Sequence, residues 1–143
     1  MGSRALPSAR LSGAPAVPQQ AIYPSEPESV RPARRYVREV VARQESAVPE
    51  DVLDTLELLA SELVTNAVRY GKEPGDSLKV AVDVSPGRCR VEVHDSRRKR
   101  PRVRPASRDR SRGRGLLLVQ ALAEQWGVAE RPFGKIVWVV ITW

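Results

Sequence analysis

The chain has 143 residues, of which 41% are hydrophobic and 29% charged, so it is long enough to form one globular domain with its own core. Its single cysteine and single histidine exclude a disulfide framework within the chain, a cysteine-based zinc site and Cys–His nucleophilic chemistry. No apolar run approaches the roughly 18 residues that a membrane span needs, and no signal peptide is recognisable. We therefore expect a protein of the bacterial cytoplasm.

The positive charge of the chain is concentrated in one segment. The net charge is +7, but residues 96–115 contain ten arginines and lysines and one acid, a local charge of +9. The remainder of the chain therefore carries a charge of −2. A single basic segment on a nearly neutral body is not the pattern of a uniformly basic nucleic-acid-binding protein.

The first half of the chain predicts an irregular arm followed by two helices. Residues 1–21 are rich in proline, alanine, serine and glutamine and show no periodicity, so we expect a disordered arm before a domain spanning 22–143. Apolar residues at helical spacing predict an amphipathic helix over 29–44. A longer helix is expected from about 49 to 70, with acids favouring its start and Gly71 positioned as a C-terminal cap.

The second half predicts a hairpin, a third helix and two further strands. Alternating apolar residues indicate strands over 78–84 and 89–93, joined by a turn at 85–88. A third helix is expected from Gly115 to Trp126 and ended by Gly127, followed by a short strand at 128–129 and a terminal strand over 136–142. This order predicts an α+β fold, a two-layer α/β sandwich whose mixed, mostly antiparallel sheet has helices on one face.

Two polar residues on the long predicted helix are the first candidates for chemistry. Glu62 and Asn66 are four residues apart, so their side chains project from the same side of the helix. The carboxamide oxygen of Asn66 is a suitable ligand for a magnesium ion, and Glu62 can orient or deprotonate a nucleophile. Taken alone, the pair is more typical of two solvated polar residues on a helix, because such pairs are common by chance.

Two further candidates follow along the chain. Asp95 ends the second hairpin strand, where its carboxylate can accept a hydrogen bond from an exocyclic amine such as that of adenine, or simply terminate the strand before a turn. Gly113-Arg114-Gly115 precedes the third helix, and such a helix start can bind phosphate through its free N–H groups. The alternative for these glycines is an ordinary flexible loop.

In this order, the candidates resemble the Bergerat-type nucleotide fold of the GHKL ATPase superfamily. The resemblance covers about residues 23–143 and is greatest to the short anti-sigma-factor serine/threonine kinases. It depends on four stretches: residues 61–71 (SELVTNAVRYG), 91–95 (VEVHD), 113–119 (GRGLLLV) and 134–138 (GKIVW).

The resemblance implies roles for individual residues. Glu62 would be the catalytic base, Asn66 would bind magnesium, and Asp95 would recognise the adenine of ATP. Gly113, Arg114, Gly115 and Leu116 would form the glycine box under the phosphates, with residues 96–112 as a lid. Where the family carries glycines just after the aspartate, residues 96–99 of this chain read SRRK, and Ile136 replaces a residue that often bears a hydroxyl.

Three functions remain open at this point. The first is an ATP- and Mg²⁺-dependent protein serine/threonine kinase that phosphorylates an antagonist protein and sequesters a sigma factor, a class that often forms homodimers. The second is a non-catalytic, nucleotide-dependent protein–protein interaction switch, which the altered first glycine box favours. The third, nucleic-acid binding through the basic segment, is weaker because residues 96–115 contain no aromatic side chain for base stacking.

Overall fold

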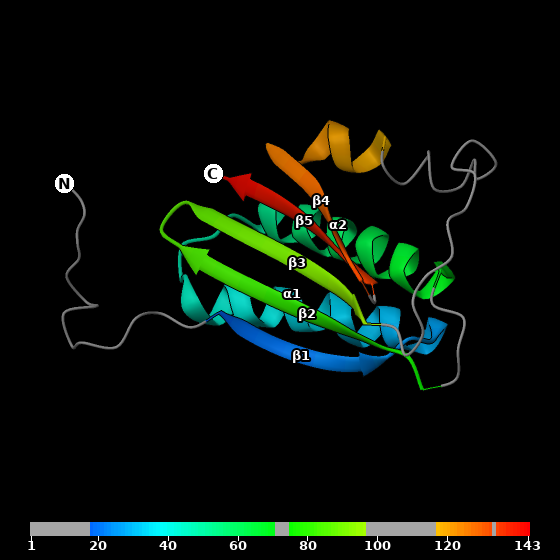
Figure 1. The fold of residues 1–143 in the computed structure, drawn as a ribbon. Helices are drawn as coiled ribbons and strands as arrows, with labels where there is room; N and C mark the ends of the chain where they lie inside the picture. The colour runs from blue at the N-terminus through cyan, green and yellow to red at the C-terminus, as the bar shows by residue number, and fades with distance from the viewer. Residues whose placement is uncertain (1–17, 71–74, 97–116, 133) are drawn as a thin grey trace, which may run out of the picture.

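The protein, represented by a computed structural model, is described for residues 18–70, 75–96, 117–132 and 134–143 (Figure 1). Within these ranges, five strands form one sheet in the order β1-β2-β3-β5-β4, and each of the four pairings is antiparallel. The elements are β1 (Gln19–Pro24), a 3-10 turn η2 (Pro27–Ser29), α1 (Val30–Gln44), α2 (Glu50–Tyr70), β2 (Ser77–Ser85), β3 (Arg88–Ser96), β4 (Gln125–Arg131) and β5 (Gly134–Thr142).

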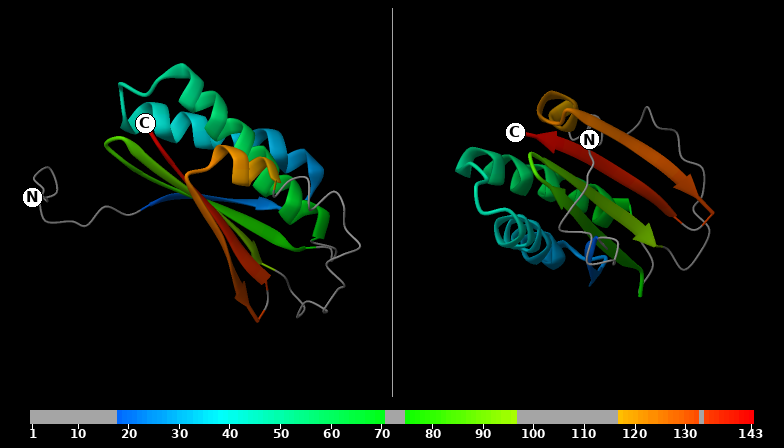
Figure 2. Two further views of the ribbon diagram at one scale, coloured as in Figure 1. Left: turned by 90° about the horizontal axis from the view of Figure 1, so that it is seen from above. Right: turned by 90° about the vertical axis from the view of Figure 1, so that its left-hand side faces the viewer.

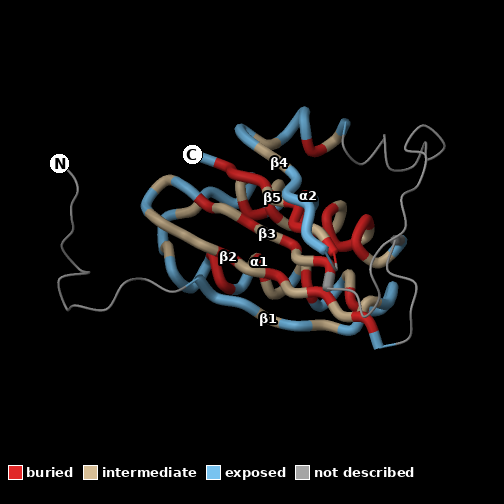
Figure 3. Tube along the Cα trace, in the orientation of Figure 1, coloured by how far each residue is buried: buried red, intermediate tan, exposed pale blue. Residues whose placement is uncertain are grey.

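Both long helices cover the same face of the sheet, which gives a two-layer α+β fold (Figure 2). Their apolar stripes pack onto alternate residues of the strands. Figure 3 shows buried residues on both helices and on the central strands. Each large apolar side chain removed from water in this way contributes roughly 1.5–3 kcal/mol. The most completely buried side chains are those of Leu56, Leu59, Leu63, Leu78, Val37, Val40, Val41, Val64, Val80, Val82, Val91 and Val93.

The register of the sheet decides which strand residues face the helices. Val91 and Val93 of β3 lie opposite valines of both β2 and β5, so the central strands share one apolar row. Cys89 belongs to the same side of β3 and is fully buried. Burial, with a smaller contribution from the charge of Asp83, raises the pKa of the Cys89 thiol to about 12. This cysteine is therefore a neutral core residue.

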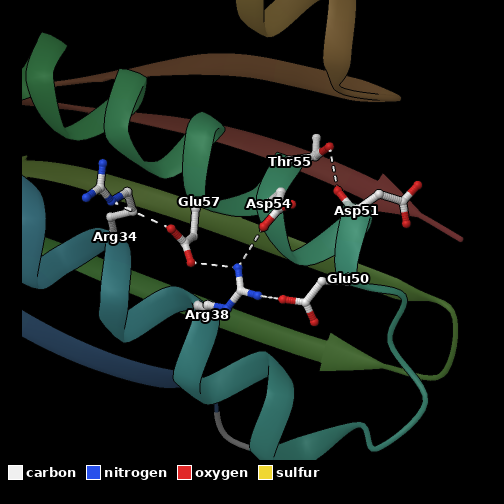
Figure 4. A network of polar contacts seen from close by, with 7 residues as sticks. All are labelled: Arg34, Arg38, Glu50, Asp51, Asp54, Thr55 and Glu57. Atoms are coloured by element: carbon white, nitrogen blue, oxygen red, sulfur yellow. Dashed lines mark hydrogen bonds and ion pairs between the residues drawn. The ribbon is translucent and has the colours of Figure 1, made fainter.

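A cluster of ion pairs joins α1 to the first half of α2 (Figure 4). The guanidinium of Arg38 contacts Glu50, lies 3.0 Å from Asp54 and lies 2.7 Å from Glu57. The hydrogen bonds that Arg38 donates to Asp54 and Glu57 raise the pKa of Arg38, so it stays charged. Exposed pairs contribute little individually, but three carboxylates around one guanidinium fix how the two helices pack. The second half of α2 lies outside this cluster.

The structure confirms the two long helices, the hairpin and the terminal strand, and it differs from the sequence prediction in three places. The strand β1 was not predicted, and it includes residues 19–21 of the expected disordered arm; residues 1–17 lie outside the described residues. The sheet is antiparallel rather than mixed in its described pairings. The third difference concerns the helix that was expected to end at Trp126.

The described part of that third helix ends at Leu122, and the chain enters β4 at Gln125. Trp126 is therefore a strand residue, and Gly127 lies in mid-strand rather than at a helix end. A Cβ atom on Gly127 would lie 2.6 Å from the ring of Trp138, so the glycine provides space for that indole. No described helix is long and apolar enough to cross a membrane.

Candidate functional site

The sequence-predicted polar residues come from the ends of two elements that meet at one edge of the sheet. The helix α2 ends at Tyr70 and β3 ends at Ser96, both on the right-hand side of Figure 1. Because β3 pairs antiparallel with β2 and β5, the starts of those two strands lie at the same edge. The topology therefore places the C-terminal half of α2 beside the carboxyl end of β3.

Asn66 lies on the buried side of α2. It is only 9% exposed and follows Leu59 and Leu63 at helical spacing, so it continues the apolar stripe with a carboxamide. Glu62, one turn earlier, is half-buried. A buried polar side chain costs free energy unless it has a hydrogen-bonding partner. A carboxamide in an apolar stripe near a helix end is therefore typical of a binding site, where a ligand can provide that partner.

Like Asn66 on α2, Asp95 lies on the buried side of its element, near the end of β3. It continues the alternation of Val91 and Val93, lies opposite Leu78 on one neighbour and Lys135 on the other, and is 4% exposed. Its Oδ1 atom is buried and accepts no hydrogen bond from the described residues, although the residue takes part in another interaction. Burying a carboxylate costs free energy, so a buried aspartate indicates a functional site more strongly than a surface aspartate at a turn does.

The remaining predicted site residues lie outside the described residues. Gly113, Arg114, Gly115 and Leu116 belong to this part of the chain, as do residues 97–112 and the expected cap Gly71. Their proposed contacts with phosphate stay predictions. The adjoining helical segment 117–122 is described, and its Val119 is 1% exposed and packs into the core.

The donor groups at this edge are of the kinds that could contact a magnesium nucleotide. Among the described residues, no group of three or more histidine, cysteine, aspartate or glutamate side chains could hold a metal. Magnesium usually keeps few protein ligands and completes its coordination with substrate phosphates and water. The buried carboxamide oxygen of Asn66 suits that single protein contact, and the carboxylate of Asp95 suits an amino group.

The opposite, uncovered face of β3 carries a hydrogen-bonded row that the sequence did not predict. Glu92 accepts a hydrogen bond from Arg90 at 2.7 Å and lies 2.8 Å from the His94 Nε2 atom. The Arg90 guanidinium also stacks on Trp138, 4.3 Å from the ring centroid. The row makes His94 a partly covered surface residue bonded to a carboxylate, and not a member of the predicted site.

This row predicts a pH-dependent effect of replacing Glu92 by glutamine. Burial alone would raise the pKa of Glu92, but the hydrogen bonds from Arg90 and His94 outweigh it and lower the pKa below its ordinary value of 4.5. Ionised Glu92 therefore stabilises the fold above that value, and the stabilisation is lost as the pH falls through the lower, folded-state pKa. We expect E92Q to lower the thermal unfolding midpoint at about pH 6, and the difference from the native protein to shrink below about pH 4.5.

Asp83→Asn on the neighbouring strand is the matched control, because Asp83 forms no ion pair with another described residue. A difference between E92Q and the native protein that stayed constant down to pH 3 would contradict the role assigned to the row.

Comparisons with known proteins give one family and one shared fold. The model of the histidine kinase-like ATPase domain family matches residues 23–141. A crystal structure of the RsbU and RsbW domains of Rv1364c from Mycobacterium tuberculosis superposes with a TM-score of 0.66 at 20% sequence identity, over 90% of this chain and 32% of that one. The chain thus spans about a third of that protein's length.

A second solved structure, the mycobacterial sensor histidine kinase MprB, is 15% identical, with a TM-score of 0.48 over 88% of this chain and 97% of that one. No curated protein sequence matches the chain.

Proposed function

Because the chain belongs to the histidine kinase-like ATPase domain family, we propose that it binds ATP with Mg²⁺ between the C-terminal half of α2 and the end of β3. In this proposal the protein is a regulatory serine/threonine kinase that phosphorylates an antagonist protein and binds a sigma factor. The observation that carries it is the burial of two polar side chains, Asn66 and Asp95, at one edge of the fold and on its inner side.

Each residue of the site has a separate part in the proposed reaction. Asp95 accepts a hydrogen bond from the exocyclic amine of adenine and orients the base. Asn66 contributes its carboxamide oxygen to Mg²⁺, which when bound neutralises charge on the phosphate oxygens. Residues 113–116 would donate backbone N–H groups to the phosphates, and the arginines before them add positive charge.

Glu62 is proposed to act on the nucleophile. Ionised, it accepts the proton of a serine or threonine hydroxyl as that oxygen bonds to the γ-phosphorus and the bond to the β-phosphate oxygen breaks, releasing ADP. The half-buried position of Glu62 one turn from Asn66 is compatible with this, because a substrate hydroxyl must reach it from outside.

The magnesium assignment predicts a selective effect of Asn66→Ala. We expect this variant to bind ATP about tenfold more weakly than the native protein when Mg²⁺ is present, since one charge-assisted contact is lost. In excess chelator the two proteins should differ by less than about twofold. Isothermal titration calorimetry measures both conditions, and Thr65→Ala is the neighbouring control. Equal weakening with and without Mg²⁺ would exclude Asn66 as a magnesium ligand.

The second candidate function is a switch that binds nucleotide without transferring phosphate. The sequence SRRK at 96–99, where related kinases carry glycines, favours it. Incubation with γ-labelled ATP and the candidate antagonist protein separates the two. Label on a serine or threonine of the antagonist supports the kinase, whereas ATP-dependent complex formation without label supports the switch.

A further inference from the structure

The described helices leave one face of the sheet uncovered (Figure 2). On that face, at the strand ends that also carry the candidate site, there is a hollow of about 550 Å³. Its shape follows from the strand register. One cross-strand row carries the longer side chains of Ile22, Lys79, His94 and Ile136, in that order across β1, β2, β3 and β5. The next row, nearer the strand ends, contains the short residues Ser77 and Gly134. These small residues leave a depression beside the larger side chains of the first row.

The lining of the hollow is positively charged at both sides. Lys79 lies on β2, and Arg131 lies on the far edge strand β4. Neither has an acidic partner in the described part of the chain. Lys135 adds a third cation and Asp95 the one carboxylate of the lining, so the net charge is positive even with neutral His94.

Apolar groups are interspersed with these cations. Ile22 lies beyond Lys79 on the edge strand β1 and is 71% exposed, which is unusual for an isoleucine on a strand. Ile136 lies between Lys79 and Arg131. In strand order the lining reads apolar Ile22, cationic Lys79, His94, apolar Ile136 and cationic Arg131, so a ligand that complements it must carry both acidic and apolar side chains.

The spacing of the cations indicates the size of that ligand. The strands β2 and β4 are three strand spacings apart, about 14 Å at roughly 4.8 Å per strand. One carboxylate or phosphate cannot contact both cations over that distance. An extended polypeptide advances about 3.3 Å per residue, so acidic residues four positions apart would reach Lys79 and Arg131 together.

We propose that this hollow is a docking site for an extended acidic segment of a partner protein. Every second residue of the segment faces the sheet, and these sheet-facing residues are alternately apolar and acidic. The segment crosses the strands, with its acids on Lys79 and Arg131. One apolar side chain lies on the exposed Ile22, and the next lies over the part of Ile136 that lines the hollow, a residue that is 8% exposed. A second copy of this chain centred on the hollow would place cations against cations, because a two-fold interface brings each patch onto itself. Nucleic acid would find no aromatic side chain in the described lining for base stacking.

The test uses the full chain and two fluorescein-labelled peptides. In one, isoleucine and glutamate alternate at every second position with serine between them, so that both face the same side of an extended chain, and in the other glutamine replaces each glutamate. Fluorescence anisotropy at low ionic strength should show the glutamate peptide binding at least tenfold more tightly. K79E and R131E should each weaken that binding about tenfold, since attraction becomes repulsion. R88E is the matched control, because Arg88 is exposed on the same face at the opposite end of β3, and it should change the affinity less than twofold.

Asp95 belongs both to the lining of the hollow and to the proposed nucleotide site, but it continues the buried side of β3, whereas Lys79 and Arg131 lie on the uncovered face. ATP binding should therefore be unchanged in K79E and R131E. Equal affinity for the two peptides, or an effect of R88E as large as that of K79E, would overturn the proposal. Self-association of the native protein that K79E abolishes would also overturn it, because the occupant would then be a second copy of the chain. Binding of a DNA oligonucleotide more tightly than the glutamate peptide, with the same dependence on Lys79, would assign the hollow to nucleic acid instead.

Discussion

Asp95→Asn is expected to weaken ATP binding by roughly 10- to 100-fold, the largest change in affinity among single substitutions at the site. The substitution keeps the shape of the side chain but replaces an ionised acceptor, and a hydrogen bond to a charged group is worth about 1.5–3 kcal/mol. The new amide also presents N–H donors where the amine of adenine donates. Calorimetric titration of MgATP into both proteins measures the effect.

Asp95 is 4% exposed, and asparagine keeps the volume and shape of its side chain. The thermal unfolding midpoint of D95N, measured beside the titration, separates a loss of ATP affinity from a loss of the fold. Asp83→Asn, on the uncovered face of the neighbouring strand, is the control and should leave ATP affinity unchanged. Native-like affinity in D95N would remove Asp95 from the nucleotide site.

Glu62→Gln should have the largest effect on the reaction itself. Glutamine cannot take up the proton of the attacking hydroxyl, and a positioned general base contributes typically 10²- to 10⁴-fold to rate. We expect phosphoryl transfer to the antagonist to slow by about that factor while the affinity for ATP changes less than about twofold. Single-turnover transfer from γ-labelled ATP measures the rate, and calorimetry measures the affinity.

Glu39→Gln, an exposed substitution on α1, serves as the control for the loss of one carboxylate. A transfer rate in E62Q equal to that of the native protein would show that another group accepts the proton. Loss of ATP affinity together with the rate would show that Glu62 holds the nucleotide rather than the nucleophile.

The elements that could be predicted from the sequence are those defined by local periodicity. The stripes of α1 and α2 and the alternation in β2, β3 and β5 persist over many residues, so tertiary packing and local pattern agree. The strand β1 could not be predicted because its residues 19–24 mix polar and apolar types and gain their order by pairing with β2, more than fifty positions later. That pairing leaves no signal in the segment itself.

The end of the third helix was mispredicted for a related reason. Trp126 follows Val119 and Ala123 at helical spacing, and Gly127 then resembles a helix stop. In the structure the backbone N–H of Glu124 donates to the Val140 carbonyl, which ties the chain to β5 just before β4 begins. The glycine is required by the indole of Trp138, a residue of another strand, so its role could not be inferred locally.

The candidate site could be predicted in part. The burial of Asn66 follows from the spacing of α2, and the inward position of Asp95 follows from its alternation with Val93. That Asn66 and Asp95 lie at the same edge of the fold depends on how α2 packs against β3. This packing could be predicted only from the resemblance to a known fold. The hollow on the uncovered face takes its residues from five strands, so it becomes visible only with the register of the whole sheet.

The most direct test of MgATP binding at this edge is a nuclear magnetic resonance titration of the native protein, following backbone amides. We expect the largest chemical-shift changes at Asn66 and Asp95. We expect none at Glu50 and Asp54, because these two residues lie in the first half of α2, a helix about 30 Å long, far from the proposed site. Saturable shifts confined to those first-half residues or to the uncovered face, with Asn66 and Asp95 unmoved, would contradict the nucleotide site proposed here.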